Sequence, residues 1–282
     1  MTVSSAPPTP PARVLIVAGS DSSGGAGIQA DIKTVTMLGG YAMTAITALT
    51  AQNTLGVTAV ETMSADMVAD QIRACLDDIG ADAVKTGMIG SAAQIRVLAA
   101  ALDAYADRHG AALPLIVDPV MIATSGAALM QEETLAALTG TLLPRAAVVT
   151  PNAPELARLT GMAADSEEDV AAAARALSER HGIAVLAKGG HLPGPEVVDL
   201  LVQPGADLCR WAAPRLPGGE FHGTGCTLAS GVAAGLAAGL PLAAASARAR
   251  AFVRAAIAAA PGLGGGSTPL AHEAVDLSAL QG

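Results

Sequence analysis

Aromatic and charged side chains are both scarce in this chain of 282 residues. Aromatic residues make up 2%, so a flat ring bound here would find few side chains to stack on. Charged residues make up 15%, and 25 acidic residues against 16 Lys and Arg give a net charge of −9. This excludes general binding to nucleic acids or anionic membranes, whose phosphates demand clustered positive charge. A single phosphorylated ligand is compatible with it, since backbone N–H groups bind phosphate.

Cysteine is also rare. Cys75, Cys209 and Cys226 are too few and too widely spaced for a disulfide framework or a zinc site, which favours a reduced compartment. Residues 1–12 are rich in Pro, Ser and Thr and have neither a basic start nor an apolar stretch. They do not resemble a secretory signal, and we expect a disordered tail on a cytoplasmic protein.

An uncharged run over residues 227–247 has some likeness to a membrane span. Gly231, Gly235 and Gly239 repeat at the small-x-x-x-small spacing of transmembrane packing faces. Pro241 interrupts the run, and Ala and Gly dominate it. A buried helix packed closely against a sheet is therefore the better interpretation.

Short apolar runs alternate with longer segments of helical periodicity, which predicts an α/β fold: a mostly parallel sheet with helices on both faces. The expected strands are residues 14–18, 42–49, 83–85, 115–117, 147–150 and 184–187, with a hairpin strand at 197–202. The expected helices are residues 27–38, 65–79, 91–108, 131–143, 155–160, 166–181 and 226–237. No repeat or long linker divides the chain, so residues 13–282 are expected to form one domain.

Polar or Gly-rich segments follow six of these strands, where ligands of such sheets bind. Residues 222–226, His-Gly-Thr-Gly-Cys, also open a helix, and their N–H groups and the helix dipole would form an anion hole for transferred phosphate. An ordinary helix start capped by Thr224 is an equally good interpretation. Cys226 is either a base, its pKa lowered by the helix N-terminus, or a small buried residue, as we expect for Cys75 and Cys209.

The first Gly-rich segment contains Gly25-Ala-Gly27-Ile-Gln-Ala30, which fits a dinucleotide-binding fingerprint. That fingerprint requires an acidic residue about 20 positions later, and the sequence there is Leu49-Thr-Ala-Gln-Asn53. A nicotinamide or flavin site is therefore rejected, and close approach of a small substrate fits better.

Several polar residues at the strand ends have two interpretations each. Asp31 either favours the helix dipole or accepts hydrogen bonds from a substrate amine. Gln52 is a turn residue or reads a pyrimidine edge, to which it offers a donor and an acceptor. Glu155 with Asn152 forms a helix start or organises Mg²⁺ through water. The remaining candidates are Asp118 beside that metal, Lys188 on nucleotide phosphate or in solvent, and Met88 and Val120 as plain core.

Together these motifs resemble the hydroxymethylpyrimidine and phosphomethylpyrimidine kinases of thiamine biosynthesis, which have the three-layer ribokinase-like fold. The matching stretches are AGSDSSGGAGIQAD, ITALTAQNT, KTGMIG, DPVM, TPNAPEL, KGGH and HGTGCT, in family order over about residues 14–261. The resemblance implies ATP and Mg²⁺ as cofactors, and a pyrimidine site at Gly19, Asp31, Gln52, Met88 and Val120. It further implies an anion hole at Gly223, Thr224, Gly225 and Cys226, a nucleotide site at Lys188, Asn152 and Thr224, and metal organisation by Glu155 and Asp118.

Cys226 stands where other ribokinase-like enzymes have an aspartate base. A thiol need not repel the phosphate that is the second acceptor, and Cys226→Ala is expected to harm the first step more than the second. Residues 212–221 depart from the expected polar approach to the anion hole, and we expect only the kinase half, because no thiamine-phosphate-synthase extension follows Pro261. We also expect a homodimer. The alternatives are a pyridoxal kinase of the same subgroup and a non-catalytic pyrimidine sensor.

Overall fold

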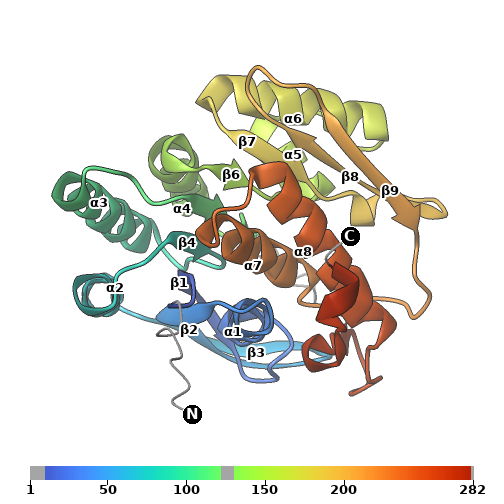
Figure 1. The fold of residues 1–282 in the computed structure, drawn as a ribbon, viewed down its shortest axis with the longest axis horizontal. Coiled ribbons are helices and arrows are strands. Elements are labelled where there is room, and N and C mark those ends of the chain that lie inside the picture. The colour runs from blue at the N-terminus through green and yellow to red at the C-terminus, as the bar shows by residue number, and fades with distance from the viewer. Residues whose placement is uncertain (1–9, 122–129, 281–282) are drawn as a thin grey trace, which may run out of the picture.

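A nine-stranded sheet forms the centre of a computed structural model that describes residues 10–121 and 130–280 (Figure 1). Its strand order is β3-β2-β1-β4-β5-β6-β7-β8-β9. The pairings from β2 to β7 are parallel, whereas β3 pairs antiparallel with β2, and β8 pairs antiparallel with β7 and β9. The strands are β1 (Arg13–Asp21), β2 (Tyr41–Asn53), β3 (Gly56–Thr62), β4 (Ala83–Thr86), β5 (Leu115–Val117), β6 (Val148–Val149), β7 (Ala184–Ala187), β8 (Glu196–Val202) and β9 (Cys209–Pro214). A separate parallel pair joins β10 (Phe221–His222) to β11 (Thr268–Pro269).

Helices cover both faces of this sheet and complete three layers (Figure 1). One face carries α1 (Gly27–Met37), α7 (Thr224–Ala237) and α8 (Leu242–Ala258). The other carries α2 (Ala65–Asp78), α3 (Ala92–His109), α4 (Glu132–Ala137), α5 (Ala153–Thr160) and α6 (Glu167–His181). Side chains alternate along β1, so that Leu15 and Val17 pack under the second group and Ile16 under the first. The three-layer fold and the mostly parallel sheet expected from the sequence are confirmed.

The expected elements agree closely with the observed ones where apolar periodicity is strong. The strands expected at residues 115–117 and 184–187 are β5 and β7 without change. The helix expected at 131–143 is shorter, because α4 ends at Ala137 and continues as a π turn (Leu138–Leu142) and a 3₁₀ turn (Leu143–Arg145). The sequence did not predict β3, β9, β10, β11 or α8. Of the tail expected over residues 1–12, only residues 10–12 lie within the described chain, and they form no helix or strand.

The glycine-spaced run is explained by contact between two helices. A Cβ atom at Gly231 would lie 2.8 Å from Ala249 Cβ, and one at Gly235 would lie 2.6 Å from Ala245 Cβ. The two glycines therefore let α7 and α8 approach closely, whereas Gly239 lies beyond α7 with φ +81° and ends it. Within the described residues, no helix has the length and apolar character needed to cross a membrane.

Candidate active site

Among the described residues, no side chain caps the N-terminus of α7. Gly223 is its N-cap, with φ +84°, and Thr224 already belongs to the helix. By contrast, Ser64, Asn152 and Ser166 each accept a hydrogen bond from the first turn of their own helix. The interpretation of Thr224 as an ordinary cap is therefore wrong. The first-turn N–H groups of α7 remain available to an anion, and the helix dipole adds to their attraction.

Close backbone approach shapes this N-terminus. A Cβ atom at Gly223 would lie 1.9 Å from the carbonyl oxygen of Gly25, so the loop after β1 touches the start of α7 directly. A Cβ atom at Gly225 would lie 3.1 Å from Lys188 Nζ and 3.7 Å from Asp118 Oδ2. Glycine at these positions brings the expected anion hole, the β1 loop and a cation together.

Lys188 is the cation that faces α7, and it lies between two carboxylates. Its Nζ donates to Asp118 Oδ1 at 3.0 Å and lies 3.8 Å from Glu155 Oε2. Thr150 also donates to Asp118, at 3.2 Å. Burial would lower the pKa of Lys188, but attraction to Asp118 and Glu155 raises it above its usual value. The ammonium group is therefore charged at neutral pH.

Asn152 and Glu155 form a capping box at the start of α5. The Asn152 side chain accepts from the Glu155 N–H at 2.9 Å, and Glu155 Oε2 accepts from the Asn152 N–H at 2.8 Å. The helix-start interpretation of this pair is confirmed, and the pair also lies beside Lys188. Burial raises the pKa of Glu155, with Asp118 adding to the effect and Lys188 opposing it.

The Cys226 thiol does not ionise readily. Burial raises its pKa to about 12, and Asp31 and Asp118 add to the rise, although Lys85 and a hydrogen bond from the Gly27 N–H oppose it. The expected lowering by the helix N-terminus is therefore wrong in direction, because loss of hydration and nearby negative charge outweigh the dipole. Cys226 is a neutral thiol at physiological pH.

Asp31 lies in the interior and is bonded within the chain. Its carboxylate oxygens each lie 2.8 Å from Lys85 Nζ, and Ser230 of α7 donates to it at 2.6 Å. The side chains of Asp31 and Lys85 are both 0% exposed. Burial alone would lower the pKa of Lys85, but Asp31, Cys226 and Asp118 raise it. The structure thus gives Asp31 an internal cation as partner, and the expected contact with a substrate amine is not available in this arrangement.

Two other expected pyrimidine residues do meet. A Cβ atom at Gly19 would lie 2.5 Å from Met88 Cε, so the Met88 side chain lies over the Gly19 backbone. Thr47 holds the Met88 carbonyl with a hydrogen bond of 2.6 Å. Val120, half-buried at the end of the Asp118 turn, borders residues 122–129, which lie outside the described chain.

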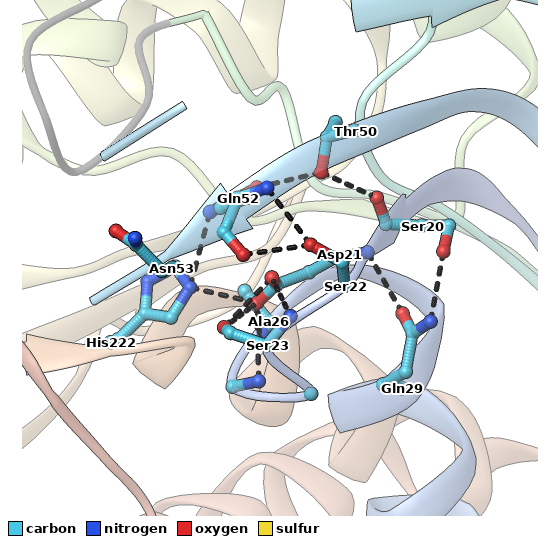
Figure 2. A network of polar contacts seen from close by, with 12 residues as sticks. Ser20, Asp21, Ser22, Ser23, Ala26, Gln29, Thr50, Gln52, Asn53 and His222 are labelled. Atoms are coloured by element: carbon cyan, nitrogen blue, oxygen red, sulfur yellow. Dashed lines mark hydrogen bonds and ion pairs between the residues drawn. The ribbon is translucent and has the colours of Figure 1, made fainter. Parts of the chain in front are cut away.

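Asp21 organises the loop after β1 (Figure 2). Its carboxylate accepts from the Ser23 hydroxyl and from the N–H groups of Ser23, Gly25 and Ala26, at 2.7–3.1 Å, and His222 Nε2 lies 2.9 Å from Oδ2. Burial opposes ionisation, but these hydrogen bonds lower the pKa of Asp21 to about 2. Sequence reasoning missed Asp21 and His222 as partners, although both belong to motifs that it identified.

Gln52 joins this network from β2. Its backbone N–H donates to Ser22 Oγ at 2.8 Å, and its side-chain amide lies between Thr50 and His222 (Figure 2). A cavity of about 280 Å³ opens here, lined by Gln52, Asn53, Thr54, Leu55, Gly56, Glu220, His222, Gly266 and Ser267. Of the site residues expected from the sequence, Gln52 is the one found among the described residues that line this cavity.

Arg215 holds the loop after β7 in place. Its guanidinium donates to the carbonyl oxygens of Gly190, Leu192 and Gly194 at 2.9, 2.6 and 3.1 Å. This loop begins directly after Lys188. Residues 212–221, which depart from the expected family pattern, therefore still contribute one polar side chain, Arg215, that holds the chain beside Lys188.

Comparisons with known proteins agree on one family. The sequence profile of the phosphomethylpyrimidine kinase family matches residues 21–271. The hydroxymethylpyrimidine/phosphomethylpyrimidine kinase of Streptomyces coelicolor is 46% identical over 272 residues, covering 96% of this chain and 98% of that protein. The bifunctional thiamine biosynthesis protein ThiED of Geobacter sulfurreducens is 48% identical over 226 residues, which are 80% of this chain and 45% of that longer protein.

Solved structures give the same fold. A Staphylococcus aureus pyridoxal kinase in complex with AMP-PCP and pyridoxal has a TM-score of 0.85 at 33% identity, covering 94% of this chain and 95% of that one. A phosphomethylpyrimidine kinase from Clostridium difficile has a TM-score of 0.76 at 38% identity, covering 87% of this chain and 99% of that one. The chain therefore belongs to the phosphomethylpyrimidine kinase family and is a kinase with the ribokinase-like fold.

Proposed function

We propose that the chain transfers a phosphoryl group from ATP to the alcohol of 4-amino-5-hydroxymethyl-2-methylpyrimidine, and then a second one to the resulting monophosphate. The observation that carries the proposal is the N-terminus of α7, which no described side chain caps and which faces the half-buried cation Lys188 in a chain of this family. The AMP-PCP complex of the similar pyridoxal kinase supports ATP as the donor.

The residues at this site supply position and charge for an in-line transfer. The acceptor oxygen attacks the γ-phosphorus as its bond to the leaving ADP oxygen breaks. N–H groups of Gly225 and Cys226 would bind the equatorial phosphate oxygens, and Lys188 would offset their charge. The neutral Cys226 thiol does not take the alcohol proton, which leaves to solvent as the new bond forms. The expectation that Cys226→Ala harms the first step more depended on a basic thiol, and we now expect similar losses in both steps.

The carboxylates beside Lys188 fit a water-mediated Mg²⁺. Asp118 and Glu155 both approach the same ammonium group, and within the described residues no set of three His, Cys, Asp or Glu side chains could hold a metal ion. Mg²⁺ accepts one or two carboxylates when water and phosphate complete its shell. When bound, it would neutralise charge on the transferred phosphate. Asp118 and Glu155 would orient its water ligands.

We also propose that the protein acts in the cytoplasm as a homodimer. β3 is an edge strand of the sheet, and Val60 on it is 47% exposed. Apolar side chains on an open strand edge favour a second copy as partner. Sedimentation of the purified protein, beside a Val60→Lys variant, tests this interface.

A pyridoxal kinase is the second candidate, favoured by the TM-score of 0.85 to the pyridoxal kinase structure. ADP release with hydroxymethylpyrimidine, its monophosphate and pyridoxal as acceptors separates the two. Rapid turnover of both pyrimidines supports the proposed function. Turnover of pyridoxal alone refutes the assigned substrate while leaving the anion hole in place. Binding of the pyrimidine without turnover of any acceptor favours a sensor.

A further inference from the structure

Asp199 on β8 and Arg250 on α8 form an ion pair that the proposed transfer does not use. Arg250 Nε donates to Asp199 Oδ2 at 2.6 Å, and the Asp199 and Arg250 side chains are 12% and 11% exposed. Trp211, which lies opposite Asp199 on β9, also contacts the guanidinium. Its carbonyl oxygen accepts from Arg250 Nη2 at 3.3 Å, and its ring centroid lies 5.3 Å from Arg250 Cζ. Solvent therefore screens this pair little, and β8, β9 and α8 together fix its geometry.

The second oxygen of Asp199 holds the backbone directly after Lys188. Asp199 Oδ1 accepts from the Gly189 N–H at 3.0 Å. A Cβ atom at Gly189 would lie 1.8 Å from the Val198 carbonyl oxygen, so only glycine fits this close to β8. The turn that follows Lys188 (Gly189–His191), here called the Lys188 turn, is therefore anchored to β8 at its first residue.

The Lys188 side chain extends from this fixed part of the backbone. The Lys188 N–H donates to the Pro151 carbonyl oxygen at 2.8 Å, so hydrogen bonds hold the peptide groups on both sides of its Cα. A Cβ atom at Gly225, in the first turn of α7, would lie 3.1 Å from Lys188 Nζ. Displacing a positioning group by about 1 Å can lower the rate about a hundredfold. The place of the ammonium group therefore depends on Asp199, which bonds the next residue of the chain.

We propose that Asp199 and Arg250 are positioning residues, which hold the Lys188 turn where the lysine meets the nucleotide phosphate. Asp199 acts through the Gly189 N–H, and Arg250 acts through Asp199 by fixing the direction of its carboxylate. Neither side chain has to touch ATP or the acceptor. The inference rests on the proposed function, because that function assigns Lys188 to the transferred phosphate.

The test measures the affinity for AMP-PCP and the KM values for ATP and for the acceptor in Asp199→Ala and Arg250→Met. Asp199→Ala leaves the Gly189 N–H without its acceptor, and should weaken AMP-PCP binding and raise the KM for ATP at least about tenfold. Arg250→Met leaves that acceptor in place but removes the group that directs it, so both values should change about threefold. The KM for the acceptor should stay within about twofold, because the acceptor binds away from the substituted residues.

Amide hydrogen exchange gives a readout that a general loss of stability does not reproduce. In Asp199→Ala, the amide hydrogens of the Lys188 turn should exchange faster, while those of β1 in the centre of the sheet keep their protection. Faster exchange throughout the sheet means that the substitution acts on the whole fold, and this result overturns the inference.

Asp82→Ala is the matched control. Asp82 also accepts one backbone N–H and one guanidinium, both from Arg13, at 2.8 and 2.7 Å. These two residues lie where β4 and β1 begin, whereas Lys188 follows the end of β7, at the opposite end of the parallel strands. The control should change neither the affinity for AMP-PCP nor exchange in the Lys188 turn.

Equal rises in both KM values, or an unchanged KM for ATP in both variants, overturn the inference. If Asp199→Ala does not fold, Arg250→Met decides. A wild type that phosphorylates pyridoxal alone refutes the assigned acceptor, and the same measurements with pyridoxal then still test the role of Asp199. If no acceptor is turned over, AMP-PCP binding and hydrogen exchange give the answer, so failure of the proposed function and failure of this inference are distinguishable.

Discussion

Replacing Lys85 with methionine should destabilise the fold strongly. The change removes the ammonium group that lies 2.8 Å from both oxygens of Asp31, where both side chains are 0% exposed. Water does not reach this site to replace it, and a buried charge left unpaired costs about 3–5 kcal/mol. Methionine occupies a similar volume, so a cavity adds little to the loss. The typical stability of a domain is about 5–15 kcal/mol, which makes this loss a large fraction of the total.

Urea unfolding at pH 7 measures the effect as a lower midpoint at unchanged slope. The double variant Asp31→Leu with Lys85→Met removes both charges together and leaves the Ser230 hydroxyl without its acceptor, at about 1–3 kcal/mol. It should therefore be more stable than Lys85→Met alone. A loss below about 1 kcal/mol in the single variant, or a double loss equal to the sum of both single losses, would refute the reasoning.

Three further predictions concern the packing of α7 on α8, the buried side chain of His272 and the contacts of Arg215. Gly235→Ala should lower the free energy of unfolding by about 1–3 kcal/mol, although alanine has the better helix propensity, because its Cβ would press on Ala245. Adding Ala245→Gly removes the facing Cβ and should restore the lost stability. If the losses of the two single variants simply add in the double variant, the packing argument is wrong. Burial lowers the pKa of His272 to about 4, so the unfolded chain binds a proton there before the folded protein does. The free energy of unfolding should therefore fall as the pH drops from about 6.5 to 4. Urea unfolding of His272→Leu over the same pH range should lack this contribution. Arg215→Ala should raise the KM for ATP about three- to tenfold without changing that for the pyrimidine, and equal changes in both would exclude a clamp on the nucleotide side.

Elements with strong periodicity and clear caps could be predicted from the sequence. Ser64, Ser91 and Ser166 each accept a backbone hydrogen bond from the first turn of the helix that follows, so a local signal marks where these helices begin. β3 was missed because an exposed edge strand has no core face to impose alternation. α8 was missed because its sequence is dominated by Ala and its first residues continue the uncharged run over residues 227–247, so it shows little apolar periodicity of its own.

The site residues could be predicted as a set but not as pairs. A single Lys85 among apolar residues of a strand was a usable signal for a buried cation, yet nothing local indicates that Asp31, 54 positions earlier, is its partner. The same holds for Asp21 and His222, which are 201 positions apart. The direction of the Cys226 pKa shift depends on burial and on carboxylates from other strands, which a motif does not contain.

The contact between Gly223 and Gly25 has a consequence for how this chain tolerates mutation. A side chain at Gly223 would collide with the backbone of the other loop at 1.9 Å, and no rotamer relieves a clash with a carbonyl oxygen. The position also has φ +84°, which any other residue adopts only with strain. A single substitution there has no compensating side-chain change elsewhere. The loop after β1 and the turn that opens α7 are therefore expected to vary only as a unit among descendants of this sequence.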